Sequence, residues 1–288
     1  SPPSSGTTMP GCEMPAPTSR KSPVKFQPSS LLLASLLCLH LAAQPPGTGA
    51  AVLPISASIP EDAEIQKVIA PLAAEIKATF DLPLVQAPQG VFRGRRGEEN
   101  LLGYWVSDVM RQAAQGAVDS PVRFAITNAG GLRSNLRPGL LKVADIFEMM
   151  PFENELVVIE LTGAEVMQVV KEGLVRRGGE PCSGVIVKVE GTPEQATLTI
   201  TWADGSPIDP KVTVKVATSD YLYGGGDSIP TLKQGRKPFT TGITLRQMLL
   251  DQCANLAKAK QDLLPPAPGR YTIPVPIQEA IRDKKFKL

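Results

Sequence analysis

The sequence predicts an α+β fold, in which helices and a largely antiparallel or mixed sheet form mixed α/β layers. Apolar residues recur at helical spacing in several segments, and short runs rich in β-branched residues lie between them, bounded by glycine and proline. Of the 288 residues, 42% are hydrophobic and 20% are charged, which is ordinary for a globular protein with a buried core. Because no internal repeat is present, one domain is the simplest arrangement.

Two helices are expected in the first part of this domain. Apolar residues at helical spacing predict a helix over 65–76, which Pro71 is expected to kink or divide. An extended piece over 82–92 and a basic turn over 93–96 come next, and a second helix is expected over 98–115. The arginines of the turn precede the positive end of the second helix, where an anion binds favourably.

Strands and helices alternate through the rest of the chain. We expect strands over 122–126, 156–161, 185–189, 197–202 and 211–217, and helices over 143–149, 164–173 and 245–256. The dipeptide Asp204-Gly205 is a hairpin or turn signal between the last two strands. We expect the folded domain to span 52–262, and a Pro-rich tail over 263–288 to contain a surface helix.

Residues 1–51 differ in composition from the rest and are rich in proline, serine and glycine. Basic residues from Arg20 onward precede an apolar run over 31–43 that ends in the small residues Ala42 and Ala43. This pattern predicts a secretory signal, with an apolar run too short to span a bilayer. We therefore expect an extension that is disordered or cleaved, no stable membrane span, and an exported, periplasmic or extracellular protein. The alternative is an uncleaved membrane anchor.

The four cysteines divide in the same way. Cys12 and Cys38 lie in the extension, whereas Cys182 and Cys253 lie in the domain. In an oxidising compartment the second pair forms either one disulfide or two free buried thiols, and both alternatives remain open at this point. Their spacing is not that of a metal site.

Several kinds of chemistry are excluded. A net charge of +2 is not typical of a nucleic-acid-binding protein. Histidine occurs once, at His40 in the extension, so the mature domain has no histidine for a zinc site, a His-rich two-metal centre or a Ser/His couple. No acidic cluster, nucleophile elbow or phosphate-binding Walker loop is present. We therefore expect no cofactor, metal or catalytic residue in this chain.

Two motifs indicate a binding site. The first places Asn128, two glycines and Arg133 after the predicted strand 122–126, where a ligand can approach the main chain closely, and Phe152 before the strand 156–161. The alternative is that the glycines only form a turn and that Phe152 is a core residue.

The second motif, DYLYGGGD over 220–227, combines an aromatic ring with a carboxylate. Tyr221 could lie against one face of a flat ring held against Phe152, and such stacking is worth about 1–3 kcal/mol per base. Asp227 offers two acceptor oxygens that suit the paired hydroxyls of a ribose, and Arg96 and Arg133 would contact phosphate. The alternative is a glycine turn with tyrosines that fill a seam of the core.

These segments, in this order, resemble the C-terminal substrate-binding domain of the 5'-nucleotidase and UDP-sugar hydrolase family. The segments are NAGGLRS, GLLKVADIFEMMPFENELVVIELTG and YLYGGGD, and the similarity covers roughly residues 60–255. The resemblance implies helices packed on both sides of β layers. It also implies a substrate that lies between this domain and an N-terminal metallophosphatase domain.

The resemblance assigns roles to individual residues. On the phosphate side, Asn128, Gly131 and Arg133 match a loop that contacts the sugar and phosphate end of the nucleotide, and Arg96 matches a second phosphate-side arginine.

On the base side, Phe152 and Tyr221 match the aromatic pair that sandwiches the base, with Asn154 at its edge. Asp227 matches the acid that holds the ribose hydroxyls, and Gly184 matches a backbone contact.

Three departures from the family pattern bear on specificity rather than on binding. Tyr221 replaces a usual Phe, Asp220 replaces a usual Asn, and Ser228 replaces a usual Gly. The larger departure is that no segment of the sequence matches the metallophosphatase domain.

We therefore expect the substrate-recognition domain of a 5'-nucleotidase-type hydrolase in nucleotide catabolism, which binds nucleoside 5'-phosphates or UDP-sugars. Hydrolysis would rely on a separately encoded metallophosphatase chain that holds the divalent metals. The alternatives are an exported nucleotide-binding protein without a hydrolytic role and a degenerate interaction domain.

Overall fold

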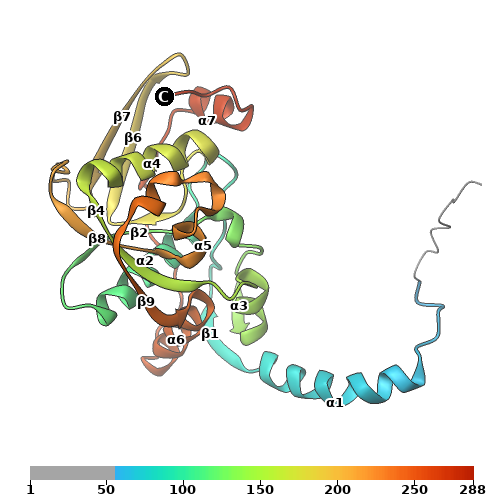
Figure 1. Ribbon diagram of the computed structural model, residues 1–288. Helices are drawn as coiled ribbons and strands as arrows, with labels where there is room; N and C mark the ends of the chain where they lie inside the picture. The colour runs from blue at the N-terminus through green and yellow to red at the C-terminus, as the bar shows by residue number, and fades with distance from the viewer. Residues whose placement is uncertain (1–55) are drawn as a thin grey trace, which may run out of the picture. The chain divides into compact units, whose positions relative to one another are not determined.

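The structure is a computed structural model that describes residues 56–288, and residues 60–288 form one compact unit (Figure 1). The expected signal segment, with Cys12, Cys38 and His40, lies outside the described residues.

A five-stranded sheet forms the centre of this unit. Its strand order is β5-β2-β8-β4-β9 (Figure 1). The strands are β5 (Cys182–Ser183), β2 (Val122–Ile126), β8 (Thr213–Ser219), β4 (Glu155–Thr162) and β9 (Arg236–Thr244). β2 and β8 run parallel, and every other neighbouring pair is antiparallel, so the sheet is mixed, as the sequence predicts.

Both faces of this sheet are apolar, because successive side chains of a strand point to opposite faces. In β4, Leu156 and Val158 pack into one core cluster, whereas Val157, Ile159 and Leu161 pack into the other. All five are almost fully buried. The sheet therefore needs a covering layer on each side.

Helices cover the first face. These are α2 (Leu101–Ala117), α3 (Val143–Met149) and α6 (Leu245–Lys258), together with the strand pair β1 (Pro83–Ala87) and β3 (Gly139–Lys142). The Asn100 side chain accepts a hydrogen bond of 2.8 Å from the Gly103 N–H and caps the start of α2. The helices expected over 98–115, 143–149 and 245–256 are thus confirmed within a few residues.

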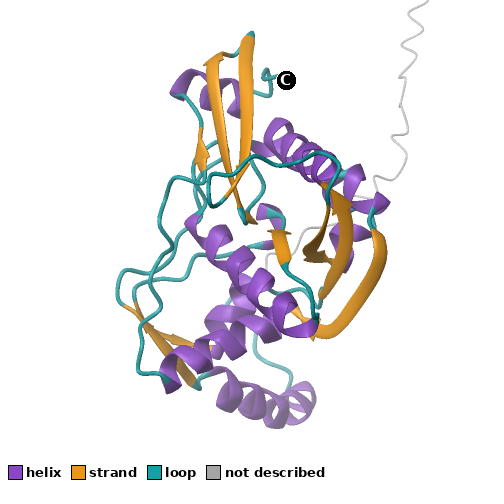
Figure 2. Cartoon of the chain, turned by 90° about the vertical axis from the view of Figure 1, so that its left-hand side faces the viewer, coloured by secondary structure: helices purple, strands orange, loops and turns teal. Residues whose placement is uncertain are grey.

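The second face is covered by a helix and a smaller sheet. They comprise α4 (Gly163–Arg177), the sheet β10-β6-β7 with β10 (Tyr271–Thr272), β6 (Val185–Thr192) and β7 (Gln195–Trp202), and α7 (Val275–Arg282). Figure 2 shows β6 and β7 as a pair of long strands. Three short helices complete this side: α5 (Asp220–Tyr223), η2 (Gly226–Ser228) and η3 (Pro230–Gln234). Helices on both sides of β layers confirm the predicted fold class.

The first helix, α1 (Ala63–Phe80), runs through Pro71 without being divided. The Asp62 side chain caps it by accepting the Glu64 and Ile65 N–H groups at 2.9 and 3.1 Å. No residue of α1 is buried. Its last residue, Phe80, packs against Phe147 of α3 with 4.7 Å between the ring centroids. Among residues 56–288, no helix is long and apolar enough to cross a membrane.

Of the two alternatives predicted at Asp204-Gly205, a hairpin that joins β7 to β8 is excluded, because these strands belong to different sheets, and the turn is confirmed. β7 pairs instead with β6 over its full length, from Val185–Trp202 to Thr192–Gln195. The Asp204-Gly205 dipeptide does form a tight turn: Gly205 has φ of 83° and its N–H donates to the Trp202 carbonyl at 2.9 Å. The turn folds the chain back along the end of β7, where Trp202 donates its N–H to the Ser206 carbonyl at 3.0 Å and Thr201 and Pro207 form an isolated antiparallel bridge.

The C-terminal tail contributes to the core. The expected surface helix is present as α7, but Ile277 and Ile281 on one of its faces are buried, as is Phe286 after it. Leu263, at the start of the tail, is also buried and donates its N–H to the Gln86 carbonyl at 2.7 Å. Residues 263–288 are therefore a packed part of the fold rather than an appendage.

Cys182 and Cys253 are both free and buried, so the free-thiol alternative is confirmed and the disulfide is excluded. They belong to the core clusters on opposite faces of the central sheet. Burial raises the pKa of Cys182 to about 11 and that of Cys253 to about 12, which makes both thiols unreactive.

One ion pair joins α4 to β9 and makes stability depend on pH. Arg236 donates two hydrogen bonds, of 2.9 and 2.8 Å, to Glu165, which also accepts the Thr162 N–H at 2.6 Å. The Arg236 hydrogen bonds are the main cause that lowers the pKa of Glu165 from 4.5 to about 2, against the opposing effect of partial burial.

We expect Glu165→Gln to lower the free energy of unfolding by about 1–2 kcal/mol at pH 7, a charged hydrogen-bond energy reduced because Arg236 is half exposed. The folded pKa is depressed, so this stability is present above pH 4.5 and is lost as the pH falls toward 2. Urea unfolding of both proteins at pH 7 and near pH 3 measures this, with exposed Glu194→Gln as the control. An equal difference at both pH values would contradict the assignment.

Candidate functional site

A pocket lies at one edge of the central sheet, where four strands begin or end. The carboxyl ends of the parallel strands β2 and β8 meet there, and the antiparallel strand β4 begins there. β9 ends at the same edge, since Thr244 pairs with Glu155. The cavity has two adjoining parts, with volumes of about 320 Å³ and about 410 Å³, and the smaller part is described first.

This first part, here called the aromatic pocket, brings together seven of the residues that the sequence predicts. They are Asn128, Gly131, Arg133, Phe152, Asn154, Tyr221 and Asp227. Met150, Arg177 and Leu245 are among the other residues that line it. The predicted residues come from three loops that are far apart in sequence, so it is the strand order of the sheet that assembles them.

The loop after β2 forms the floor of this pocket. Ala129–Gly131 is a single turn of 3-10 helix that follows Asn128. A Cβ atom on Gly131 would lie 3.0 Å from the Asn128 side-chain oxygen, so the absence of a side chain keeps the two residues in close contact. Arg133 is fixed by its N–H, which donates to the Met149 carbonyl at 2.8 Å, and its guanidinium lies 5.0 Å above the centre of the Phe152 ring.

Two aromatic side chains line the pocket without being covered. Phe152 is 37% exposed and Tyr221 is 44% exposed, so the alternative that they fill the core is wrong. Tyr221 lies directly on the glycine loop, because a Cβ atom on Gly226 would be 2.5 Å from its ring. The loop therefore needs glycine there to seat the ring.

Asp227 is held in the left-handed backbone region, with φ of 53°. Such strain costs about 1–3 kcal/mol in a residue other than glycine and is typical of functional sites. Its carboxylate accepts hydrogen bonds from Asn128 at 2.6 Å and Arg176 at 2.8 Å. Partial burial acts to raise the pKa of Asp227, but these hydrogen bonds and the charges of Arg176 and Arg177 outweigh it, so the pKa lies below its usual range.

Sequence reasoning missed a buried carboxylate beside the pocket. Glu180 is fully buried and accepts the Ala129 N–H at 2.7 Å, and it pairs with Arg176 at 3.0 Å and Arg177 at 3.4 Å. Burial raises the pKa of Glu180, and the Ala129 N–H and the two guanidinium groups oppose that rise. Glu180 thus ties the loop after β2 to the end of α4. The basic pair Arg176 and Arg177, which precedes two glycines, is a sequence feature that could have indicated a buried acidic partner. Basic residues are, however, ordinary at the ends of helices, so the pair does not point to one.

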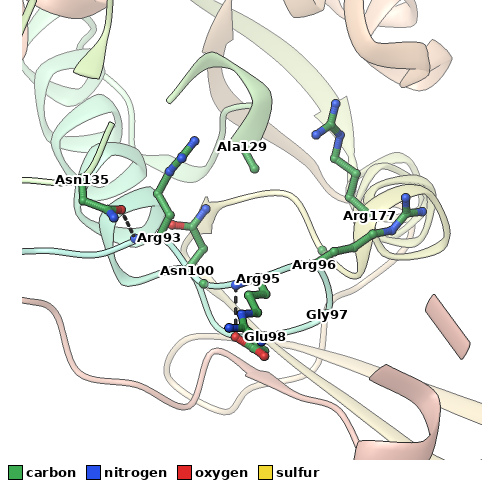
Figure 3. Close-up of a pocket in the computed structure, with 11 residues that line it drawn as sticks. Arg93, Arg95, Arg96, Gly97, Glu98, Asn100, Ala129, Asn135 and Arg177 are labelled. Carbon is green, nitrogen blue, oxygen red and sulfur yellow. Dashed lines mark hydrogen bonds between the residues drawn. The ribbon is translucent and has the colours of Figure 1, made fainter. Parts of the chain in front are cut away.

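The second part, here called the arginine pocket, has a volume of about 410 Å³ and adjoins the first through Arg177, which lines both. Arg93, Arg95 and Arg96 also line it (Figure 3). Arg96 therefore lies beside the aromatic pocket rather than in it. Its guanidinium donates to the Arg176 carbonyl, while its Nε atom is buried and has no hydrogen-bond partner among the described residues. The arrangement of guanidinium groups suits an anion.

Gly184 does not reach either pocket. It lies between β5 and β6 with φ of 95°, and a Cβ atom there would clash with the Arg123 carbonyl. It lines a separate shallow cavity with Asp108 and Arg270. The structure thus gives this glycine a conformational role away from the other predicted residues.

The family model of the 5'-nucleotidase C-terminal domain matches residues 78–234. A Treponema pallidum protein named "Probable 5'-nucleotidase" is 30% identical over 165 residues, which are 52% of this chain and 26% of that protein. Protein UshA of Escherichia coli is 24% identical over 195 residues, which are 66% of this chain and 34% of that protein. The chain thus spans about a quarter to a third of the length of these relatives.

Solved structures share the fold. The 5'-nucleotidase precursor of Thermus thermophilus superimposes with a TM-score of 0.60 at 22% identity, over 74% of this chain and 43% of the other. The Haemophilus influenzae NAD nucleotidase superimposes with a TM-score of 0.56 at 17% identity, over 73% and 41%. The match of the family model to more than half of the sequence is decisive, and the chain belongs to the 5'-nucleotidase C-terminal domain family.

Proposed function

We propose that this chain is the substrate-recognition domain of a 5'-nucleotidase-type hydrolase and that it binds nucleoside 5'-phosphates or UDP-sugars. The observation that carries the proposal is the aromatic pocket itself. It combines two uncovered aromatic rings with a carboxylate of lowered pKa, and it adjoins a pocket lined by arginines. Aromatic rings suit a flat base, a carboxylate suits the hydroxyls of a ribose, and arginines suit a phosphate.

Each part of the nucleotide has a counterpart in this proposal. The base stacks between Phe152 and Tyr221, with Asn154 at its edge. The carboxylate of Asp227 accepts hydrogen bonds from the ribose hydroxyls. The phosphate lies toward Arg133 and the arginine pocket, because guanidinium groups bind phosphate in a bidentate manner.

We propose that hydrolysis is carried out by a metallophosphatase on a separate chain, which supplies the divalent metals and the catalytic histidine. Within the given sequence the single histidine is His40, and residues 56–288 contain no group of three or more His, Cys, Asp or Glu residues that could hold a metal ion, so the metals and the histidine would come from outside these residues. The contribution of this chain is then to orient the phosphate toward those metals.

The proposal includes export from the cytoplasm. The basic and apolar pattern from Arg20 to Ala43 supports it. One relative, 29% identical over 149 residues, is named as a cell wall protein of Listeria monocytogenes.

Calorimetric titration of the purified chain with AMP and UDP-glucose tests the proposal. We expect both to bind, and we expect adenosine and ribose 5-phosphate, which lack the phosphate and the base respectively, to bind at least about ten-fold more weakly, since each loses one set of contacts. Absence of binding by every nucleotide would refute the function. Phosphate released by the chain alone with manganese, and surviving further purification, would refute the separate metallophosphatase.

A further inference from the structure

Asn154 and Asp220 join the two aromatic walls of the pocket. Asn154 lies two residues after Phe152, and Asp220 immediately precedes Tyr221. The Asn154 amide nitrogen donates to the Asp220 carboxylate at 3.0 Å. Asp220 also accepts the Tyr221 N–H at 2.7 Å, and the main-chain carbonyl of Asn154 accepts the Leu245 N–H at 2.8 Å, so the carboxylate and the backbone of Asn154 are both held in place.

The chemistry of this pair fixes the orientation of the amide. A carboxylate only accepts hydrogen bonds, so the Asn154 amide must turn its nitrogen toward Asp220. The amide oxygen is then carried on the other branch of the side chain, beside the pocket that Asn154 lines. With an amide at position 220 either orientation would be possible, since an amide both donates and accepts.

The pair also lies at a defined end of the Tyr221 ring. The Tyr221 hydroxyl is 3.5 Å from the Asp227 carboxylate, whereas the Asn154–Asp220 pair is at the backbone end of the same residue. A ribose bound to Asp227 would therefore place the far edge of its base beside Asn154 and Asp220. That edge would meet the amide oxygen of Asn154, which is an acceptor on a residue that lines the pocket, while Asp220 holds the amide in this orientation.

We propose that the Asn154–Asp220 pair selects nucleotides whose base carries an exocyclic amino group at its far edge, so that AMP and CMP are preferred to IMP and UMP. The inference rests on the proposed function, because it requires a base between Phe152 and Tyr221. An amino group donates to the Asn154 amide oxygen. The carbonyl oxygen of hypoxanthine or uracil at the same place would face the Asn154 amide oxygen without a hydrogen bond, which carries a penalty of roughly ten-fold in affinity.

Two ligand pairs, AMP with IMP and CMP with UMP, isolate this effect. AMP and CMP carry an amino group at the base edge, where IMP and UMP carry an oxygen and, on the neighbouring ring nitrogen, a proton. We expect calorimetric affinities of the full chain to favour AMP and CMP by about ten-fold. In Asp220→Asn we expect both preferences to fall to about two-fold or less, because the Asn154 amide can then turn. The affinity for IMP and UMP should rise, which loss of folding cannot produce.

Asp251→Asn is the matched control, because Asp251 is an exposed residue of α6 outside the pocket and its replacement makes the same change of charge. It should leave both preferences unchanged. Equal affinities within each pair in the unaltered protein, or preferences that persist in Asp220→Asn, would overturn the inference while leaving the proposed function intact. Failure of all four nucleotides to bind would refute the proposed function itself.

Discussion

Replacing Glu180 with alanine is expected to lower the free energy of unfolding by about 2–4 kcal/mol and to weaken nucleotide binding in the same protein. The change leaves the Ala129 N–H without its partner and removes the carboxylate from Arg176 and Arg177. The loss is smaller than for a fully enclosed ion pair because the two arginines are 27% and 38% exposed and can reach water. Binding suffers because the loop after β2 and Arg177 both line the aromatic pocket.

Urea unfolding followed by circular dichroism, together with calorimetric titration with AMP, measures both effects. Glu190→Ala is the control, because Glu190 is 55% exposed and, among residues 56–288, forms an ion pair with Lys188 on the same strand and with no other residue. Its removal should change the free energy of unfolding by less than about 0.5 kcal/mol. A loss below about 1 kcal/mol for Glu180→Ala would show that this carboxylate does not hold the loop and the end of α4 together.

Phe152→Ala should weaken the binding of AMP by about 1–3 kcal/mol, which corresponds to roughly 5- to 150-fold in the dissociation constant. The Phe152 ring lines the pocket, and alanine removes the whole stacking surface. Stability should change much less, because 37% of the residue is already exposed in the folded chain.

The conservative variant Phe152→Tyr should keep most of the affinity, since a phenol ring presents the same face. Phe239→Ala is the matched control: Phe239 is 47% exposed on the edge strand β9 and does not line the pocket. If the dissociation constant for AMP were the same in Phe152→Ala as in the unaltered protein, the base would not stack on this ring.

The elements that the sequence predicts well are those with strong local patterns. The strand β4 consists largely of β-branched and other apolar residues, and α2 has an apolar side that packs on the sheet and a side-chain cap at Asn100. Such patterns decide the element whatever its neighbours are.

β9 was missed because it lacks such a pattern. It is the edge strand of the central sheet, its first five residues are exposed, and it contains Pro238 and Gly242, which both argue against a strand. Only its register with β4 identifies it, and that register depends on a partner far away in the sequence. At Asp204-Gly205 the sequence predicts a hairpin or a turn and cannot decide between them, because a turn alone does not say which strands pair; the structure has the turn without the β7–β8 hairpin.

The site divides in the same manner. The residues that line the aromatic pocket belong to two sequence motifs. Their side-chain types suit one ligand, so these residues could be predicted from the sequence before the fold was known. Glu180 could not be found, because a glutamate in a sequence is ordinarily a solvated surface residue. It is buried by contacts with Ala129, 51 residues earlier in the chain.

The order of the central sheet has a consequence for how the chain folds. Both neighbours of β4 come later in the sequence, since Val157 pairs with Thr218 of β8 and Thr240 of β9. On a ribosome that adds about 5–20 residues per second, β4 waits several seconds for the roughly 60 residues up to β8. During that time an apolar strand has no edge partner, which is the situation in which chains aggregate. The sheet can close only late in synthesis, and a chain that stops before Thr213 cannot form it.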